Sequence, residues 1–197
     1  MIAIIDSAGA NIASVKFALE RLGAESILTT DTDVIQSADR VLLPGVGAAP
    51  VAMRRLRTSG LIDCIMGLTQ PVMGICLGMQ LLFKHSDEGD IPLLGVFKSR
   101  CRSFIPVGDR SVPHMGWNRL KFKSDHPLLH GINEGAHVYF VHSYYAPVIG
   151  QTIAECDYGI DFTAMIARDN FMGCQFHPER SGLVGAKILQ NFLEIKL

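Results

Sequence analysis

The sequence has no excess of charge of either sign. Its 197 residues include 18 Lys and Arg against 19 Asp and Glu, which gives a formal net charge of -1. Near-neutral charge excludes the basic field with which proteins attract nucleic acid or an anionic membrane surface. The composition also lacks the biases of disordered, collagen-like and disulfide-rich chains. We therefore expect a compact globular protein of about one domain, with neither nucleic acid nor a membrane as a partner.

Long hydrophobic runs and paired cysteines are also missing. No apolar run approaches the ~20 residues of a membrane span, and residues 1–6 lack the basic region and apolar core of a secretion signal. The five cysteines are an odd number without a Cys-x-x-Cys pair, which disfavours a secreted disulfide framework. No Cys/His grouping has the spacing of a zinc site. We expect a cytoplasmic protein with free thiols and with neither a metal nor a cofactor.

The first half of the chain alternates short apolar runs with helical patterns. Continuous apolar runs are typical of parallel strands covered on both faces, and the intervening helices then supply right-handed crossovers. The expected strands are residues 2–5, 26–29, 40–43 and 72–75, the third being cut by Pro44 and Gly45. The expected helices begin at about residue 11, cover roughly residues 50–66 and cover residues 77–83.

The second half has short apolar segments separated by Gly, Asp and Asn turns, which suggests antiparallel hairpins. The expected strands are residues 96–98, 101–105, 138–141, 153–156, 163–167 and 173–176, followed by a helix over 183–195. Neither a linker nor an internal repeat interrupts the chain. The sequence therefore predicts a single α/β domain over residues 1–197, with an open, mostly parallel sheet, flanking helices and antiparallel hairpins in the second half.

A candidate nucleophile follows the strand at 72–75. Residues 74–78 read Gly-Ile-Cys-Leu-Gly, the Gly-x-nucleophile-x-Gly arrangement of a sharp strand-to-helix turn, with cysteine in place of serine. The amides at the start of the following helix favour a thiolate at Cys76, and the amide of Leu77 can donate to an oxyanion. A lone cysteine in an apolar run is also commonly a buried hydrophobe. Packing is the expected role of the other four cysteines, which are Cys64, Cys101, Cys156 and Cys174.

The candidate base is His177, which ends an apolar strand and precedes Pro178 and Glu179. In locally extended chain, His177 and Glu179 project to the same side, so the carboxylate can accept from one ring nitrogen while the other faces a thiol. His114 and His142 have no such carboxylate, so lining or interface roles suit them better. The remaining histidines lie beside polar or turn residues and are expected to be exposed: His85, His126, His130 and His137.

A glycine-rich loop, Leu-Pro-Gly-Val-Gly-Ala at residues 43–48, follows the third expected strand. Its glycines allow a close approach between the backbone and a ligand. A phosphate cradle is one interpretation, although the lysine and hydroxyl of a P-loop are absent. An oxyanion wall opposite Cys76 is a second, and a simple strand-to-helix turn is a third.

Together these motifs resemble those of the class I (triad) glutamine amidotransferases. The markers are Leu-Pro-Gly-Val-Gly at 43–47, Gly-Ile-Cys-Leu-Gly-Met-Gln at 74–80 and Gln-Phe-His-Pro-Glu at 175–179, and the likeness covers essentially the whole chain. The resemblance implies that Cys76 is the nucleophile, His177 the base and Glu179 its orienting partner. It further implies that the amides of Val46 and Leu77 form an oxyanion hole. The residues implied to contact the substrate L-glutamine are Gly47, Gln80, His142, Ser143 and Tyr144.

Three further stretches resemble the glutaminase subunits of imidazole glycerol phosphate synthases. They are Pro-His-Met-Gly-Trp-Asn at 113–118, Tyr-Phe-Val-His-Ser-Tyr at 139–144 and His-Pro-Glu-Arg-Ser-Gly at 177–182. In that family the subunit hydrolyses glutamine through a cysteine thioester and passes ammonia to a (β/α)₈-barrel cyclase. The cyclase makes imidazole glycerol phosphate and aminoimidazole-carboxamide ribotide in histidine biosynthesis. The resemblance implies a heterodimer, with a partner interface at Trp117, Asn118, Tyr139 and Arg180.

The chain departs from the family pattern at three places. Residues 6–11 read Asp-Ser-Ala-Gly-Ala-Asn where many members have Asp-Tyr-Gly-x-Gly-Asn, and Ala49 and Pro50 stand where many have a bulky residue. Both departures could alter partner contacts, and neither touches the triad. Arg180 replaces a lysine of many relatives, which keeps the charge but changes its geometry.

Two other functions compete with this interpretation. One is another triad amidotransferase subunit, serving anthranilate, pyridoxal phosphate or surface-sugar synthesis; the sugar-pathway subunits are the hardest to exclude because they can share the same motifs. The other is a catalytically silent binding or regulatory subunit with the same fold. The complete set of Cys76, His177 and Glu179 argues against a silent subunit.

Overall fold

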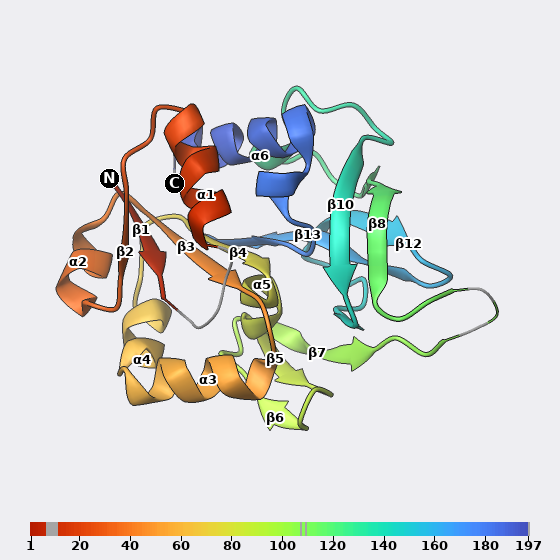
Figure 1. The fold of residues 1–197 in the computed structure, drawn as a ribbon, viewed down its shortest axis with the longest axis horizontal. Coiled ribbons are helices and arrows are strands. Elements are labelled where there is room, and N and C mark those ends of the chain that lie inside the picture. The colour runs from red at the N-terminus through yellow and green to blue at the C-terminus, as the bar shows by residue number, and fades with distance from the viewer. Residues whose placement is uncertain (7–11, 107, 109, 197) are drawn as a thin grey trace.

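A computed structural model describes residues 1–6, 12–106, 108 and 110–196, and eight of the described strands form one central sheet (Figure 1). The strand order is β2-β1-β3-β4-β14-β13-β12-β9. Neighbours are parallel from β2 to β14 and antiparallel from β14 to β9. The strands are β1 Ile2–Ile5, β2 Ser26–Thr29, β3 Arg40–Gly45, β4 Val72–Cys76, β9 Lys121–Phe122, β12 Thr152–Asp157, β13 Asp161–Arg168 and β14 Phe171–Cys174. The predicted α/β fold, with a mostly parallel sheet and antiparallel hairpins, is confirmed.

Each face of this sheet carries a hydrophobic core, because side chains alternate along a strand. In β1, Ile2 and Ile4 belong to one core, and Ala3 and Ile5 belong to the other. Helices α1 and α6 cover the first face and α2, α3 and α4 cover the second (Figure 1). The helices are α1 Ile12–Arg21, α2 Thr32–Ser37, α3 Ala49–Thr58, α4 Leu61–Met66, α5 Leu77–Leu81 and α6 Gly182–Glu194. None of the described helices is long and apolar enough to cross a membrane.

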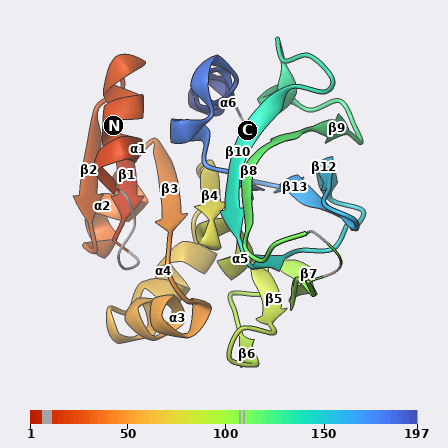
Figure 2. The ribbon, with the colours of Figure 1, turned by 45° about the vertical axis from the view of Figure 1, so that its right-hand side comes forward.

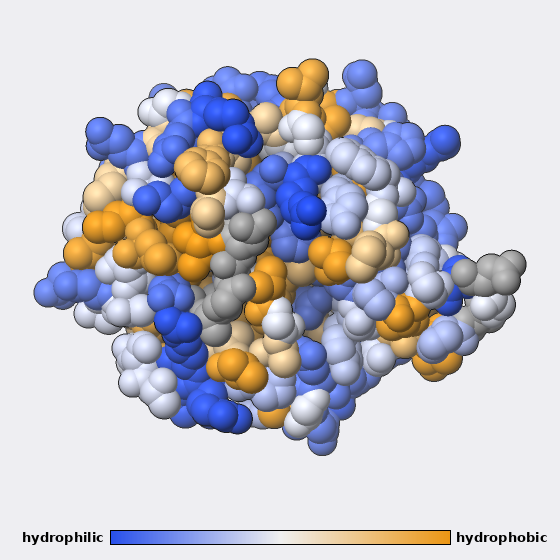
Figure 3. All heavy atoms as spheres, in the orientation of Figure 1, coloured by the Kyte–Doolittle hydropathy of each residue, from blue (hydrophilic) through white to orange (hydrophobic). Residues whose placement is uncertain are grey.

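Two smaller sheets complete the described part of the chain. One has the order β11-β7-β5-β6, and the other is a two-stranded antiparallel ribbon of β8 and β10, which lie side by side in Figure 2. Their strands are β5 Phe83–Ser86, β6 Ile91–Pro92, β7 Phe97–Ser103, β8 His114–Arg119, β10 His137–His142 and β11 Tyr144–Tyr145, and two 3-10 turns are η1 Pro127–Leu129 and η2 Pro178–Arg180. Hydrophilic and hydrophobic side chains are interspersed over the face of the molecule in Figure 3.

The local predictions were wrong at several boundaries. Strand β3 continues through Pro44 to Gly45, where it pairs in register with β4, and Pro44 lies beyond Leu42, the last residue of β3 that the described register pairs with β1. The helix predicted over 50–66 is two helices, since Gly60 adopts a φ of 68° between them. The helix predicted over 77–83 ends at Leu81, and β5 follows.

Other elements were absent from the prediction or differ in extent. Helix α2 and strand β8 were not predicted, and the two strands expected at 96–98 and 101–105 form the single strand β7. The family departure noted at residues 6–11 lies outside the described residues from residue 7 onward.

The turn between β4 and α5 is built by close backbone packing. Cys76 has φ 54° and ψ -112°, a conformation that is strained for a residue with a side chain. A Cβ atom added at Gly78 would lie 1.6 Å from the Leu43 carbonyl oxygen. One added at Gly74 would lie 2.6 Å from the backbone of Gly78. The two glycines therefore allow β3, β4 and α5 to meet closely enough to hold Cys76 in this conformation.

We predict that Gly78→Ala lowers the free energy of unfolding by about 3 kcal/mol, because the added methyl group overlaps the backbone of β3 rather than a movable side chain. Denaturant titration measures this change. Gly150→Ala is the matched control, since a Cβ at Gly150 would meet nothing within 4 Å, and it should change the stability by less than about 0.5 kcal/mol. Equal stabilities for the two variants would contradict the proposed packing constraint.

Candidate active site

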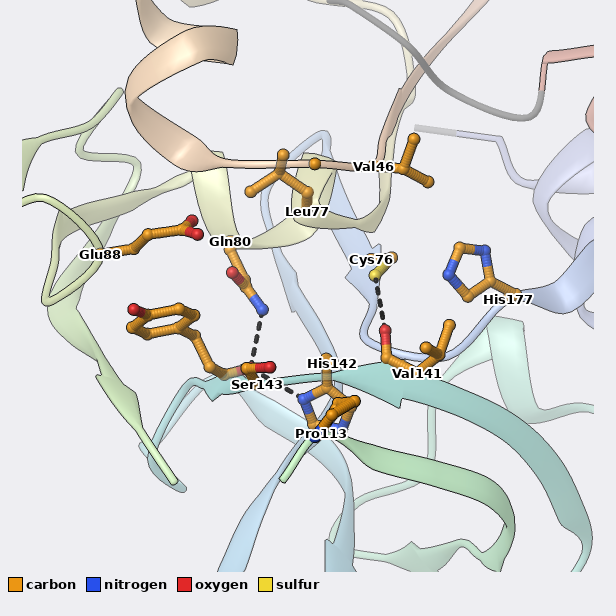
Figure 4. A pocket seen from close by; sticks show the side chains of 12 residues that line it. Val46, Cys76, Leu77, Gln80, Glu88, Pro113, Val141, His142, Ser143 and His177 are labelled. Atoms are coloured by element: carbon orange, nitrogen blue, oxygen red, sulfur yellow. Dashed lines mark hydrogen bonds between the residues drawn. The ribbon is translucent and has the colours of Figure 1, made fainter. Parts of the chain in front are cut away.

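A pocket of about 320 Å³ lies where β3 and β4 end, with Cys76 on its wall. Ligand sites of open α/β sheets commonly occupy this edge. The pocket is bounded by the loop after β3, the β4–α5 turn and the end of β10 (Figure 4). The sequence-predicted residues that line it are Val46, Gly47, Cys76, Leu77, Gln80, His142, Ser143, Tyr144 and His177.

The Cys76 side chain is held between two segments that are distant in the sequence. Its sulfur lies 3.8 Å from the Val141 carbonyl oxygen of β10 and 3.7 Å from the Gln175 amide nitrogen, just after β14. All five cysteines are free, and none of the other four described thiols lines this pocket. Burial raises the pKa of each of those four thiols, which fits the packing role expected for them.

The His177 ring lies between the pocket and the Glu179 carboxylate. Its Nδ1 is 2.8 Å from Glu179 Oε1, and the side chains are 7% and 2% exposed. The extended chain expected for this contact was wrong, because η2 begins at Pro178 and turns the carboxylate back onto the ring. The backbone amide of His177 donates to the Tyr139 carbonyl oxygen at 2.9 Å, which ties it to β10.

The second ring nitrogen of His177 is available for chemistry. Nε2 has no hydrogen-bond partner among the described residues, and Figure 4 shows the ring facing Cys76. Burial alone would lower the pKa of His177, but the Cys76 sulfur and the Glu179 carboxylate raise it to about 10. The ring is therefore cationic at neutral pH, and a cation beside the sulfur stabilises negative charge there.

Gln80 is fixed by hydrogen bonds at the floor of the pocket. Its Nε2 donates to the Tyr144 carbonyl oxygen at 2.8 Å and to Gln175 Oε1 at 2.9 Å. Gln175 lies two residues before His177 and also contacts the Cys76 sulfur. The Gln-Phe-His-Pro-Glu motif at 175–179 does not by itself indicate a role for Gln175. The fold places the Gln175 side chain beside the nucleophile.

His142 and His114 form a buried pair behind the pocket wall. His114 Nδ1 is 3.0 Å from His142 Nε2, and His142 Nδ1 is 2.7 Å from the Tyr144 carbonyl oxygen. Burial lowers the pKa of His114 to about 4 and that of His142 to about 3, so both rings are neutral at physiological pH. His142 lines the pocket as expected, and the structure places His114 one layer behind it.

Glu88 lines the pocket and was not predicted from the sequence. Among the described residues that line the pocket it is the one acidic side chain, and Figure 4 shows it on the opposite side of the pocket from His177, with Gln80 between them. Its Oε2 accepts from the Ala49 backbone amide at 2.6 Å. Glu88 lies among Asp87, Gly89 and Asp90 in a polar turn, where nothing in the local sequence separates a ligand-binding carboxylate from a solvated one.

Three of the four residues expected at a partner interface meet at the β8–β10 ribbon: Trp117, Tyr139 and Arg180. Trp117 pairs with Tyr139 across the ribbon and is 56% exposed. Their rings are 6.0 Å apart, and Arg180 Cζ lies 5.1 Å from the Tyr139 ring centre. Asn118 is next to them, but its side-chain amide donates inward, to the Asp157 carbonyl oxygen at 2.9 Å. Their role as an interface stays a prediction.

Comparison with known proteins places this fold and site in a family. The family model "Glutamine amidotransferase class-I" matches residues 3–195. The chain is 52% identical over 194 residues to the imidazole glycerol phosphate synthase subunit HisH of Xylella fastidiosa, covering 98% of this chain and 97% of that protein. It is 48% identical over 207 residues to the HisH of Colwellia psychrerythraea, covering 98% and 92%.

The chain belongs to the class-I glutamine amidotransferases, among the HisH subunits. Solved structures agree on the fold of this amidotransferase. A crystal structure of a glutamine amidotransferase matches with a TM-score of 0.75 at 19% identity, covering 98% of this chain and 97% of that one. The structure of PurLQS from Thermotoga maritima matches with a TM-score of 0.71 at 19% identity, covering 98% and 97%.

Metal-ligating side chains do not cluster in the described part of this amidotransferase. Among the described residues, no three His, Cys, Asp or Glu side chains converge as metal ligands do. The acidic and basic groups that do meet in the pocket are those already described.

We predict that Glu179→Gln lowers the pKa of His177 by at least about one unit, because a neutral amide replaces the carboxylate that stabilises the cationic ring. A nuclear magnetic resonance titration of the His177 ring measures this pKa. Glu20→Gln, on the exposed face of α1, is the matched control and should leave it unchanged. A His177 pKa that is the same in both variants would remove Glu179 as the orienting partner.

The raised pKa of His177 also makes the free energy of unfolding depend on pH. His177 binds its proton more tightly in the folded chain, with a pKa of about 10, than at its ordinary value of 6.5. This contribution to stability is therefore complete below about pH 6.5 and is lost as the pH rises through about 10. Glu179→Gln should flatten the fall in stability over that range.

Proposed function

We propose that this chain is the glutaminase subunit of imidazole glycerol phosphate synthase and supplies ammonia from glutamine to a cyclase subunit. The single observation that carries the proposal is the buried set of Cys76, His177 and Glu179 beside a pocket, in a chain about half identical to HisH subunits over its length. The products would be glutamate and ammonia, and the cyclase would use the ammonia to make imidazole glycerol phosphate and aminoimidazole-carboxamide ribotide.

In this mechanism the Cys76 sulfur attacks the amide carbon of glutamine. The cationic His177 then protonates the leaving ammonia, and the neutral ring activates the water that hydrolyses the thioester to glutamate. Three features support these roles: the His177 Nε2 that lacks a partner among the described residues, its raised pKa, and the Glu179 contact behind it. Glu179 would hold the ring orientation and stabilise its charge through both steps.

The backbone amides of Leu77 and Val46 would stabilise the oxyanion. Leu77 begins α5 directly after the nucleophile, where helix amides have no partner within the helix, and Val46 lies on the pocket wall after β3. This favours the oxyanion-wall interpretation of the 43–48 loop over a phosphate cradle. Gly47 has a φ of 91°, a conformation that glycine adopts readily, so a larger residue there would strain the loop.

The far end of the pocket suits the amino-acid end of glutamine. The amide carbon must lie over Cys76, so the α-ammonium group lies toward the opposite side, where Glu88 supplies a negative charge. Gln80, Ser143 and Tyr144 line the wall between the two ends and would contact the rest of the substrate. Gly47 and His142 complete the set proposed for glutamine binding.

The proposed partner is a cyclase with a (β/α)₈ barrel, forming a heterodimer. The exposed Trp117 and the half-buried Tyr139, with Arg180 against the tyrosine ring, have the composition of an interface anchor. Asn118 is proposed at the edge of this surface. The whole chain would act as one domain, which is supported by a family match over residues 3–195. A cytoplasmic location is supported by five free cysteines.

The cysteine variant tests the function. We predict that Cys76→Ala in the assembled synthase lowers glutamine-dependent product formation by about 10⁴-fold or more, because no thioester can form. Free ammonium salt should still support the cyclase reaction, since the acceptor binds on the partner. Both activities are followed by formation of aminoimidazole-carboxamide ribotide. Cys64→Ala, a buried thiol outside the pocket, is the control.

Two results would count against the proposal. Glutamine hydrolysis that survives in Cys76→Ala would remove the nucleophile assignment. Wild-type chain that hydrolyses glutamine but does not sustain the histidine-pathway cyclase would point instead to an amidotransferase of another pathway, such as the surface-sugar subunits.

We predict that Glu88→Gln raises the KM for glutamine by about 10- to 100-fold, because the neutral amide still accepts from the Ala49 amide but no longer pairs with an ammonium group. The comparison substrate is glutaramic acid, which has the side-chain amide of glutamine but no α-amino group. Steady-state kinetics should show that the variant has lost most of the wild-type preference for glutamine. An unchanged preference would place the α-ammonium group elsewhere.

A further inference from the structure

A continuous series of hydrogen bonds runs behind the pocket wall from strand β8 to the glutamine pocket. Asn118 Nδ2 is 3.3 Å from His114 Nε2, and His114 Nδ1 is 3.0 Å from His142 Nε2. His142 Nδ1 then meets the Tyr144 carbonyl oxygen at 2.7 Å. His114 and His142 are 3% and 6% exposed, so water does not compete for these bonds.

The positions of the protons follow from the two ends of this series. The Tyr144 carbonyl only accepts, so His142 must carry its proton on Nδ1. A neutral His142 then presents a bare Nε2, which must accept from a protonated Nδ1 of His114. The bare Nε2 of His114 finally accepts from Asn118, whose amide orientation is set because its oxygen accepts from the Arg119 backbone amide at 2.8 Å. Every bond is satisfied only when both rings are Nδ1–H tautomers.

The carbonyl at the end of the series belongs to the substrate site. The Tyr144 oxygen also accepts from Gln80 Nε2, and Gln80 holds Gln175, whose amide reaches the Cys76 sulfur. The position of the Tyr144 carbonyl therefore affects the pocket wall at residue 144 and the orientation of the Gln80 amide.

The other end of the series lies on the strand that carries the exposed ribbon face. Residues alternate along β8, so Met115 and Trp117 point outward at 61% and 56% exposure, while His114 and Asn118 point inward. His114 and His142 are also directly paired in the β8–β10 register. Strand β8 is thus joined to the pocket by side chains as well as by its ladder with β10.

We propose that Asn118, His114 and His142 form a positioning relay that runs from strand β8 to the glutamine pocket. In this relay, two neutral histidines of fixed tautomer hold the Tyr144 carbonyl and the Gln80 amide in the positions that bind glutamine. The relay deepens the proposed function and rests on it for its effect on glutamine. His114 and Asn118 do not line the pocket, so they act through His142 and are positioning residues.

The tautomers are tested directly by nitrogen-15 nuclear magnetic resonance of the full-length chain labelled at histidine, at neutral pH. The signals of His114 and His142, identified among the seven histidines by their loss in His114→Phe and His142→Phe, should each show a protonated Nδ1 and a bare Nε2. An Nε2–H tautomer at either residue would overturn the relay, because one of its bonds would then join two donors or two acceptors. This measurement does not depend on activity.

The effect on the substrate is tested by kinetics of the assembled complex at saturating partner. His114→Phe keeps a ring to stack on Tyr158 and Phe140, at 4.0 and 4.9 Å, but removes both hydrogen bonds. We expect its KM for glutamine to rise about tenfold, as for a buried hydrogen bond worth ~1.4 kcal/mol. Iodoacetamide makes none of the contacts proposed for glutamine at Gln80 and Tyr144, so its reactivity with Cys76 should change less than about twofold.

Asn118→Leu tests whether the relay extends to β8. This variant has a similar shape and loses the donor to His114, so its KM should rise about threefold. His130→Phe, with a 63% exposed side chain, is the control and should match the wild type. A wild-type KM in Asn118→Leu would overturn the relay, as would a fall in thiol reactivity in His114→Phe as large as the rise in its KM. Absence of glutamine hydrolysis in the wild-type complex would overturn the proposed function instead, and the tautomers would still decide whether the relay exists.

Discussion

The close approach of β3, β4 and α5 is the constraint on which the rest of the site depends. Cys76 has a positive φ, and this strained conformation persists only because the surrounding backbone leaves it no alternative. Gly74 and Gly78 make the approach possible, since a Cβ at either would overlap the neighbouring backbone. This conformation points the Cys76 sulfur out of the strand and toward the pocket. Cys76 directly precedes the first backbone amides of α5. A looser turn would leave Cys76 as one more buried thiol among the other four.

Strand β10 is the second organising element, because it contacts both the nucleophile and the base. Its Tyr139 carbonyl accepts from the His177 amide, its Val141 carbonyl lies beside the Cys76 sulfur, and its last residue is His142. The nucleophile comes from one parallel strand and the base from the segment after another. The distance between the nucleophile and the base is therefore fixed by the parallel sheet on one side and by the β8–β10 ribbon on the other. This arrangement links the exposed Trp117 to the proposed base, because Trp117 pairs with Tyr139, whose carbonyl accepts from the His177 amide.

Much of the fold could be read from local pattern. The apolar runs of β1 and β4 are buried strands of a parallel sheet, as their hydrophobicity predicted. The predicted bounds of helices and strands were wrong where pairing with a distant strand outweighed the local conformational preference of the residues. Pro44 stays in β3, where β4 pairs with it in register, and the apolar segment after Cys76 splits into a short helix and β5 because β7 is available to pair with it. Neither neighbour can be inferred from residues within a few positions.

The candidate site was likewise predictable in part from the local sequence and in part only from the tertiary structure. The sequence by itself determined the chemistry: a cysteine between two glycines and a His-Pro-Glu segment, both recognisable because their residue types and spacing have local physical causes. The tertiary structure alone decided which polar groups meet. Glu88 faces the pocket from an ordinary polar turn, Gln175 reaches the sulfur, and His114 finds His142 across a ribbon. Such contacts join residues tens of positions apart. A local sequence pattern does not predict them, because hydrogen bonds between distant segments depend on the register and packing of whole strands.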